Sequence, residues 1–397
     1  MKTFNYFVKT IALVSFVIIF FSTSTLKSLD NFNDAESVSD YFSGILLLNE
    51  NEYEKSFNFL KRLNGLETSH ENYSVKYLYS LINSGKFKKA FDYSKKLEKK
   101  KLDSFESHLI TGIFYLKNSN INLAQKYFLK AKTKNSGFIL NNYLSNSLYN
   151  WSSLDIKNLN QATLDLEKLD GRFENLKKIQ KVFLNCYFNS EKTNNLFDNL
   201  TKNEKVDFSR YNYFYASFEA NFGNIDKAIE IIDSSLELYP RNLLLNQYKL
   251  DLDNGLYNSK FNCNNKEHVV AEILYITSNA LSSQSIYQLS NFYLSLAKYL
   301  NQDFHSYSAL LGENYYKVEN FEEAKKVYKN LSKKGKAFHW YASKQIAKIL
   351  IQEDNNVSAV KLLTNAYNNL TFRDIYETFD YAEFLKNNEK FKDSILY

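Results

Sequence analysis

The chain repeats a pattern of apolar and small residues at a fixed spacing of 34 positions in its first third. Equivalent columns return near the C-terminus at a spacing of 35. A fixed period of this length indicates a repeat architecture, in which each unit stacks on its neighbours and no unit is stable alone. The clearest columns are Gly44, Leu78 and Gly112; Ser56, Ala90 and Ala124; Gly312, Ala347 and Ala382; and Ala324, Ala359 and Ser394.

Each repeat unit is predicted to be a pair of α-helices. Within a unit the apolar residues recur at three- and four-residue steps, which is the period of a helix face. The two helical stretches are separated by a short break at Asn51, Gly85, Ser119 or Gly223. One proline and ten glycines in 397 residues argue against a turn-dense all-β fold or a linker-rich chain. The sequence therefore predicts an all-α fold.

The best copies resemble the tetratricopeptide repeat (TPR) family. The resemblance implies a right-handed αα solenoid, or superhelix, whose concave face is lined by the first helix of each pair. The family's tryptophan column is absent, and its terminal proline occurs only at Pro240. More loosely, the plan is similar to exported repeat proteins of alphaproteobacteria, for which the family implies no catalytic activity. The copies are GIFYLKNSNINLAQKYFLKA (112–131), NFGNIDKAIEIIDSSLELYPRN (221–242) and GENYYKVENFEEAKKVYKNL (312–331).

The columns also predict how the repeats are distributed along the chain. The final repeat stops at Tyr397, part-way into its second helix. Because solenoids normally end in a polar cap, we expect the natural protein to continue beyond this residue. The expected blocks are three TPR-like repeats in 37–134, degenerate helical repeats in 135–207, TPR-like and degenerate helical repeats in 208–304, and TPR-like repeats in 305–397, the last one incomplete.

Residues 1–24 have the features of an export signal, and residues 25–36 are predicted to be a linker. Lys2 and Lys9 precede the apolar stretch 11–21, and small polar residues follow it. An uncleaved inner-membrane anchor through residues 4–26 is the alternative, because the uncharged stretch 10–26 within it is just long enough to span a bilayer. Both alternatives place the solenoid outside the cytoplasm, either periplasmic or anchored with its repeats facing the periplasm.

The positive charge does not indicate a nucleic-acid partner. The formal net charge is +6. Arginine, which matches phosphate and guanine edges with its planar donors, is rare here. Lysine supplies the remaining positive charge and alternates with Glu and Asp, as on solvated helix faces. We therefore expect no nucleic-acid binding. The arginines are Arg62, Arg172, Arg210, Arg241 and Arg373.

No catalytic or metal-binding motif stands out, so we predict neither an enzyme nor a cofactor. The chain has no HExxH, CxxC or GxSxG motif. Cys186 and Cys263 lie far apart in poorly repeating stretches, and we expect both to be free, buried thiols. The histidines have no partner at metal-ligand spacing. They are His70, His108, His268, His305 and His339.

The concave face is the remaining candidate site, as a groove for a partner's peptide. Its positions are mostly apolar with polar edges, which suits an extended or helical peptide. The alternative is that these side chains pack against neighbouring helices. The candidate residues are Tyr41, Ile45 and Asn49; Val75, Tyr79 and Asn83; and Leu109, Ile113 and Lys117.

The leading functional hypothesis is a non-catalytic protein–protein interaction scaffold of the bacterial cell envelope. It would bind partner proteins or peptides on the concave TPR face. The alternative is a helical accessory region of a cell-wall-acting enzyme, with the catalytic domain beyond Tyr397.

Overall fold

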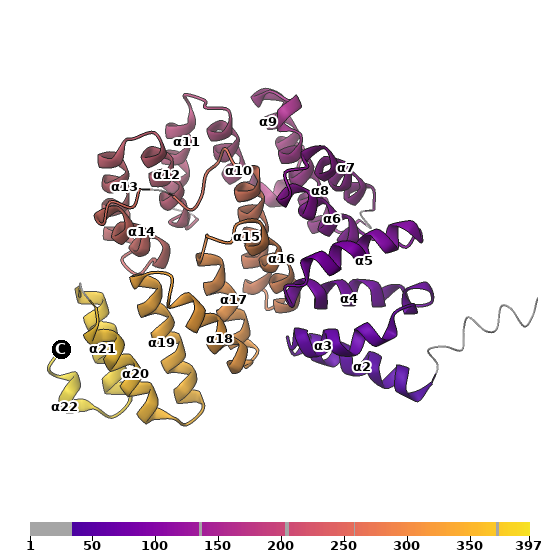
Figure 1. The fold of residues 1–397 in the computed structure, drawn as a ribbon. Coiled ribbons are helices and arrows are strands. Elements are labelled where there is room, and N and C mark those ends of the chain that lie inside the picture. Colours follow the sequence, from indigo (N-terminus) through magenta and orange to yellow (C-terminus); the bar gives the residue numbers. More distant parts are fainter. Residues whose placement is uncertain (1–33, 135–136, 203–205, 258, 371–372) are drawn as a thin grey trace, which may run out of the picture. The chain divides into compact units, whose positions relative to one another are not determined.

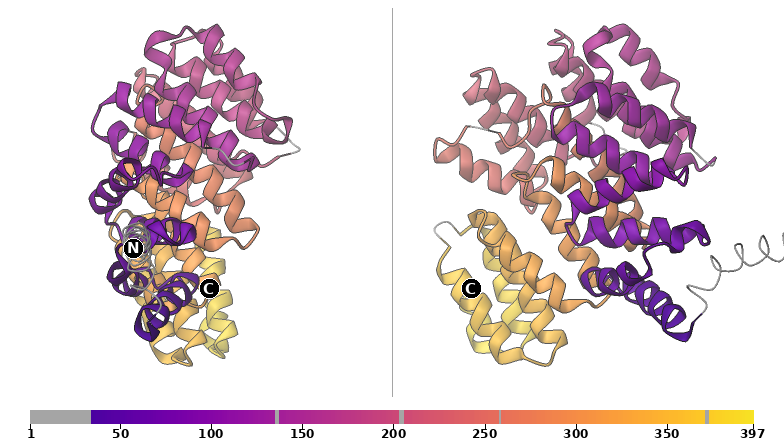
Figure 2. Two further views of the ribbon diagram at one scale, coloured as in Figure 1. Left: turned by 90° about the vertical axis from the view of Figure 1, so that its right-hand side faces the viewer. Right: turned by 45° about the vertical axis from the view of Figure 1, so that its right-hand side comes forward.

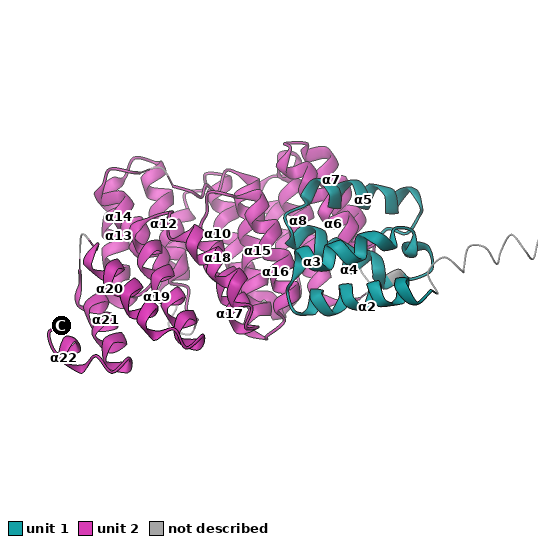
Figure 3. Ribbon diagram, turned by 60° about the horizontal axis from the view of Figure 1, so that its bottom comes forward, with its two compact units in different colours: residues 1–103 teal, residues 104–397 magenta. Residues whose placement is uncertain are grey.

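The computed structural model describes residues 34–134, 137–202, 206–257, 259–370 and 373–397. The predicted export signal or anchor and most of the predicted linker lie outside these residues. Every regular element in the described ranges is helical, which confirms the all-α prediction. None of these helices combines the length and apolar character needed to span a membrane. The chain divides into two compact units, residues 1–103 and 104–397 (Figure 3).

The first unit consists of two helix pairs. α2 packs on α3, and α4 packs on α5. Two short 3-10 turns, η2 and η3, connect the pairs. The bounds are α2 (Ala35–Asn49), α3 (Tyr53–Leu60), η2 (Lys61–Leu63), η3 (Leu66–Thr68), α4 (Glu71–Asn83) and α5 (Phe87–Lys99).

The second unit continues the same plan through the segments whose repeat columns are poor. Consecutive helices pack on one another from α6 to α14 and again from α15 to α22, and α14 contacts α19 (Figures 1 and 2). Its first part contains α6 (Phe105–Lys117), α7 (Ile121–Thr133), α8 (Ile139–Ser152), η4 (Leu154–Ile156), α9 (Leu159–Glu167), η5 (Gly171–Phe173), α10 (Glu174–Tyr187) and α11 (Thr193–Thr201). The middle contains α12 (Arg210–Asn221), α13 (Ile225–Leu238), α14 (Leu243–Asp253), α15 (Lys266–Ser283) and α16 (Tyr287–Leu300). The last part contains α17 (Ser306–Lys317), α18 (Phe321–Leu331), α19 (Lys336–Gln352), α20 (Asn356–Asn368), α21 (Ile375–Asn387) and α22 (Phe391–Ser394).

The glycine column explains how closely the two helices of a pair approach. Gly44, Gly112 and Gly312 each lie in a first helix, opposite a bulky side chain of the second. An added Cβ would lie 2.6 Å from Leu60 Cδ2, 2.5 Å from Phe128 Cε1 and 2.5 Å from Tyr328 Cε1, respectively. Carbon atoms in contact normally lie about 3.5–4.0 Å apart. These positions therefore have no room for a side chain, as the column predicts.

The small-residue column of the second helix has a second role where it contains serine. A serine hydroxyl there donates to a carbonyl of the first helix, which pins the two helices together. The bonds are Ser56 Oγ to Gly44 O at 2.7 Å, Ser290 Oγ to Ser278 O at 2.8 Å and Ser394 Oγ to Ala382 O at 2.9 Å. The alanines of this column, such as Ala90 and Ala124, are fully buried.

The break inside each pair is a left-handed residue that ends the first helix. Asn51, Gly85, Ser119 and Gly223 have φ of 59°, 72°, 57° and 83°. The next residue donates its N–H back to the last turn, as Glu52 does to Leu47 O at 2.8 Å. This is the hydrogen-bond pattern of a Schellman cap. The predicted breaks are therefore confirmed.

Helices far apart in the sequence lie side by side in the second unit (Figure 1). α15 contacts α8, and α16 contacts α6. Ion pairs cross these contacts: Lys266 Nζ lies 2.6 Å from Asp155 Oδ1, and Lys117 Nζ lies 3.2 Å from Glu267 Oε2. The chain therefore returns on itself, a feature that the repeat columns do not predict.

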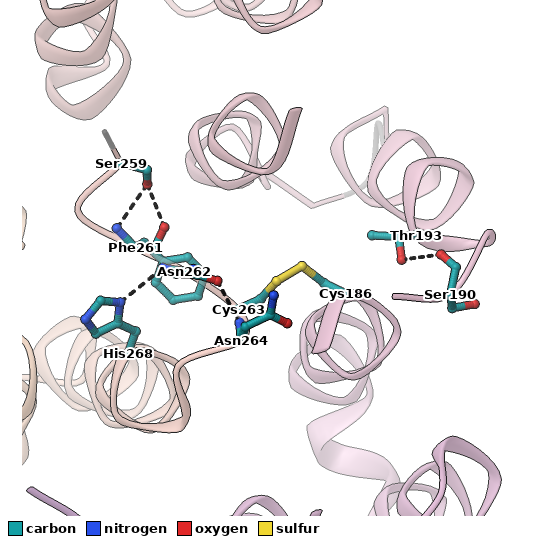
Figure 4. Close-up of a disulfide and its surroundings, with 9 residues drawn as sticks. All are labelled: Cys186, Ser190, Thr193, Ser259, Phe261, Asn262, Cys263, Asn264 and His268. Carbon is teal, nitrogen blue, oxygen red and sulfur yellow. Dashed lines mark hydrogen bonds between the residues drawn. A yellow bond between two sulfur atoms is a disulfide. The ribbon is translucent and has the colours of Figure 1, made fainter. Parts of the chain in front are cut away.

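The two cysteines form a disulfide, so the expectation of free thiols was wrong. Cys186 lies at the end of α10, and Cys263 lies in the segment that leads into α15, with 6.0 Å between their Cα atoms (Figure 4). Phe261, two residues earlier, packs its ring against Phe183 and Phe214, at centroid distances of 5.1 and 4.4 Å. This aromatic contact holds the connecting segment on α10, which brings together cysteines that are 77 positions apart.

Candidate peptide-binding site

Two of the three predicted groove rows lie side by side in the first unit. Tyr41, Ile45 and Asn49 are four residues apart and therefore share one face of α2. Val75, Tyr79 and Asn83 form the corresponding row on α4, which contacts α2. Asn49 is exposed, and the other five are partly buried. The structure therefore brings these six residues together on adjacent helices.

The third predicted row lies in the second unit, where its side chains pack against neighbouring helices. Leu109 and Ile113 are buried, and their helix α6 contacts α16. Lys117 donates to Leu300 O at 2.9 Å, in addition to its ion pair with Glu267. The returning helix α16 thus covers this row, as the packing alternative describes. The groove hypothesis is therefore confined to α2 and α4.

The exposed face of α2 adds apolar side chains that the groove columns do not include. Val38, Phe42 and Leu46 are 43%, 65% and 58% exposed and follow one another at four-residue steps. They neighbour Tyr41 and Ile45 along the same helix. Contiguous exposed apolar area of this kind marks interaction sites on soluble proteins. The signal for it was present in the sequence, as a helix with apolar residues on more than one face.

Polar contacts fix this surface in place. The Tyr41 hydroxyl lies 2.6 Å from His70 Nε2, at the start of α4, and burial raises the pKa of Tyr41. The phenol therefore stays neutral and links α2 to the adjacent repeat. On α4, the Tyr73 hydroxyl donates to Leu60 O of α3 at 2.9 Å, and the rings of Tyr73 and Tyr77 stack with their centroids 5.7 Å apart.

Two buried carboxylates near this surface, Asp40 and Glu67, are paired within the unit. Arg62 Nη1 lies 3.2 Å from the buried Asp40. The Glu67 carboxylate is fully buried and binds Lys96 and Lys100 at 2.8 and 2.9 Å. Burial opposes ionisation of Glu67, but the two lysines and backbone amides lower its pKa to about 2. These two carboxylates are therefore neutralised within the unit, and the surface offers a ligand apolar area.

Within the described ranges, no group of three or more His, Cys, Asp or Glu side chains is arranged to hold a metal ion. The histidines have packing or backbone roles where the structure defines them. His108 is buried beside Tyr127, with ring centroids 5.9 Å apart. His268 Nδ1 accepts from Asn262 N at 3.1 Å, in the segment that carries Cys263 (Figure 4).

The fold and these surfaces define the class of the molecule as a repeat protein of paired helices. No family model and no curated protein matches the sequence. Solved structures that match in part include the APC/C hetero-tetramer Cut9–Hcn1, at 10% identity over 90% of this chain and 78% of that chain, with a TM-score of 0.33. Yeast Tom70 matches at 13% identity over 89% and 95%, with a TM-score of 0.26. The complex Naa15/Naa10 bound to HypK-THB matches at 12% identity over 90% and 67%, with a TM-score of 0.22.

Proposed function

We propose that the protein is a non-catalytic interaction scaffold that binds a peptide segment of a partner protein on α2 and α4. The observation that carries the proposal is the surface formed by the two groove rows and the exposed side chains Val38, Phe42 and Leu46. Burial of apolar area contributes roughly 25 cal/mol per Å². The partner segment therefore presents apolar side chains to this surface.

Differential capture of partner proteins tests this surface. The variant Phe42→Ser/Leu46→Ser removes exposed apolar area without touching the buried contacts of α2. We expect it to reduce the recovery of partners from a periplasmic extract by about tenfold or more, as loss of a central apolar anchor does. Phe222→Ser is the control, because Phe222, the C-cap residue of α12 in the second unit, is 58% exposed. Equal recovery by both variants and the wild type would contradict the proposal.

The proposed location is the bacterial cell envelope, with the repeats in the periplasm. Two observations support it: the positively charged and then apolar stretch in residues 1–24, and the disulfide between Cys186 and Cys263. Structural disulfides persist mainly in oxidising compartments, which include the bacterial periplasm.

A fusion to alkaline phosphatase, which is active only after export, tests the location. We expect activity from the fusion to the full chain and none when residues 1–26 are deleted. Activity that does not depend on these residues would show that export does not use them.

A further inference from the structure

A hollow lies in the second unit among α12, α14 and the starts of α17 and α19 (Figure 1). The segment that leads from α14 towards α15 contributes the rest of its lining. Its volume is about 420 Å³, within the range of about 300–1,000 Å³ that is usual for small-molecule sites. The hollow can therefore hold a small organic molecule, and its lining groups indicate the class of molecule.

The inner wall of the hollow is aromatic. Tyr213, Tyr248, Phe304 and Phe338 line it and are buried. The ring of Tyr213 lies against the rings of Tyr248 and Phe304, with centroids 4.8 and 5.5 Å apart. Aromatic rings bind apolar groups, and their faces attract cations such as an ammonium group. This wall therefore suits an apolar side chain that lies beside a positively charged group.

Asp251 adds a partly buried carboxylate to the lining. It lies four residues after Gln247 on α14, and Gln247 Nε2 donates to Asp251 Oδ1 at 2.8 Å. Gln247 Oε1 accepts from Ala337 N at 3.1 Å, so this face of α14 is turned towards the start of α19. The carboxylate forms no ion pair within the described ranges, and burial raises its pKa. A bound ammonium group would compensate this charge.

Two lysines of the lining, Lys260 and Lys334, are exposed and also lack an ion-pair partner among the described residues. The backbone of Lys260 is fixed beside the aromatic wall. Its N–H donates to the Tyr213 hydroxyl at 3.3 Å, and its carbonyl accepts from Asn301 Nδ2 at 3.0 Å. The charge of Lys260 opposes the effect of burial on the pKa of Asp251, so the two groups are close without forming an ion pair.

The charges of the lining balance. Asp303 is the second acidic group, and it is exposed and without an ion pair in the part of the chain that the structure describes. His305 is uncharged at neutral pH, because burial and then the charge of Lys334 lower its pKa below its ordinary value of 6.5. Two carboxylates and two lysines thus line the hollow. A ligand with a single charge would be attracted by one pair and repelled by the other.

We propose that this hollow binds a small zwitterion with an apolar group, namely a free α-amino acid. Its ammonium group binds Asp251, its carboxylate binds Lys260 and Lys334, and its side chain lies on the aromatic wall. The proposal is independent of peptide binding on α2 and α4, because those helices belong to the first unit.

Calorimetric titration of the full chain at pH 7 with three matched probes tests the proposal. L-Phenylalanine carries both charges, phenethylamine lacks the carboxylate, and 3-phenylpropanoate lacks the ammonium group. We expect L-phenylalanine to bind at least about tenfold more tightly than either of the other two probes, because each of them loses one charge-assisted contact.

Three variants show which side chains hold the ligand. Asp251→Asn keeps the acceptor for Gln247 but removes the charge, and it should weaken binding of L-phenylalanine about tenfold without weakening that of 3-phenylpropanoate. Lys334→Gln should weaken binding of L-phenylalanine about fivefold and leave that of phenethylamine unchanged. Lys333→Gln is the matched control, because Lys333 is exposed next to Lys334 but does not line the hollow. This variant should bind all three probes as the wild type does.

Three outcomes overturn the proposal. The first is the absence of binding heat at about 10 mM L-phenylalanine, the weak end of measurable affinity. The second is equal affinity for L-phenylalanine and one of the singly charged probes, which would assign the hollow to a simple cation or anion. The third is an equal loss of affinity in Lys333→Gln and Lys334→Gln, which would indicate a general effect of surface charge.

Discussion

Replacement of Gly112 by alanine tests the packing of α6 on α7 at its tightest point. The added Cβ would lie 2.5 Å from Phe128 Cε1 and 2.6 Å from Phe128 Cδ1. Phe128 is fully buried, so its ring cannot swing into solvent. To restore a normal carbon contact, the ring or the helix has to move by about 1 Å.

The expected change in the free energy of unfolding is the difference between two opposing effects. Overpacking of a closely packed core costs about 1–3 kcal/mol. Alanine is favoured over glycine inside a helix by about 1 kcal/mol, which offsets part of that cost. A clash of about 1 Å against a fully buried ring belongs at the upper end of the overpacking cost, about 2–3 kcal/mol. We therefore expect Gly112→Ala to lower the free energy of unfolding by about 1–2 kcal/mol. Gly171→Ala is the control, because no atom lies within 4 Å of its added Cβ, and it should change stability by less than about 0.5 kcal/mol.

A double-mutant cycle isolates the contact. Phe128→Leu alone leaves a small cavity and should cost about 1–2 kcal/mol. In Gly112→Ala/Phe128→Leu the new methyl group enters that space, so the loss should fall short of the sum by about 1 kcal/mol. Urea unfolding followed by circular dichroism at 222 nm measures all four proteins. Additive losses, or a Gly112→Ala variant as stable as the wild type, would refute the close approach as the reason for glycine in this column.

Three further perturbations have defined outcomes. Cys186→Ser should lower the free energy of unfolding by about 2–4 kcal/mol, because the bond to Cys263 closes a long loop. Reductant should lower the urea midpoint of the wild type to that of the variant. A wild-type midpoint that does not change with reductant would contradict this. Burial first, and then a nearby lysine, lower the pKa of His268 to about 4 from 6.5. Between pH 6.5 and 4 the unfolded chain binds a proton at His268 that the folded chain does not bind, so the free energy of unfolding decreases as the pH falls through this range. His268→Gln should remove about 2 kcal/mol of that decrease. Equal pH dependence of the free energy of unfolding in the variant and the wild type would contradict this. Glu272→Gln removes a fully buried carboxylate whose oxygens lie 2.8 and 2.9 Å from the guanidinium of the partly buried Arg210. It should cost about 3–5 kcal/mol in the same assay; a loss below about 1 kcal/mol would mean that the pair is not needed.

The helix pairs could be read from the sequence because their determinants are local. Gly112 and Phe128 are sixteen positions apart, and the break at Ser119 lies between them. Such contacts form within one helix pair, so the apolar period and the small-residue columns are sufficient to place both of its helices. The rows on α2 and α4 followed from the same register, since adjacent repeats present equivalent faces.

The contacts between helices that are far apart in the sequence could be known only from the tertiary structure. Whether Lys117 faces a groove or pairs with Glu267, 150 positions later, depends on the path of all the helices between them. The same holds for the disulfide between Cys186 and Cys263, which are 77 positions apart. Small rotations between successive repeats add up along a solenoid, and degenerate repeats change them in ways that no column records. The sequence by itself therefore determined the repeating unit, and only the folded chain determined which units meet.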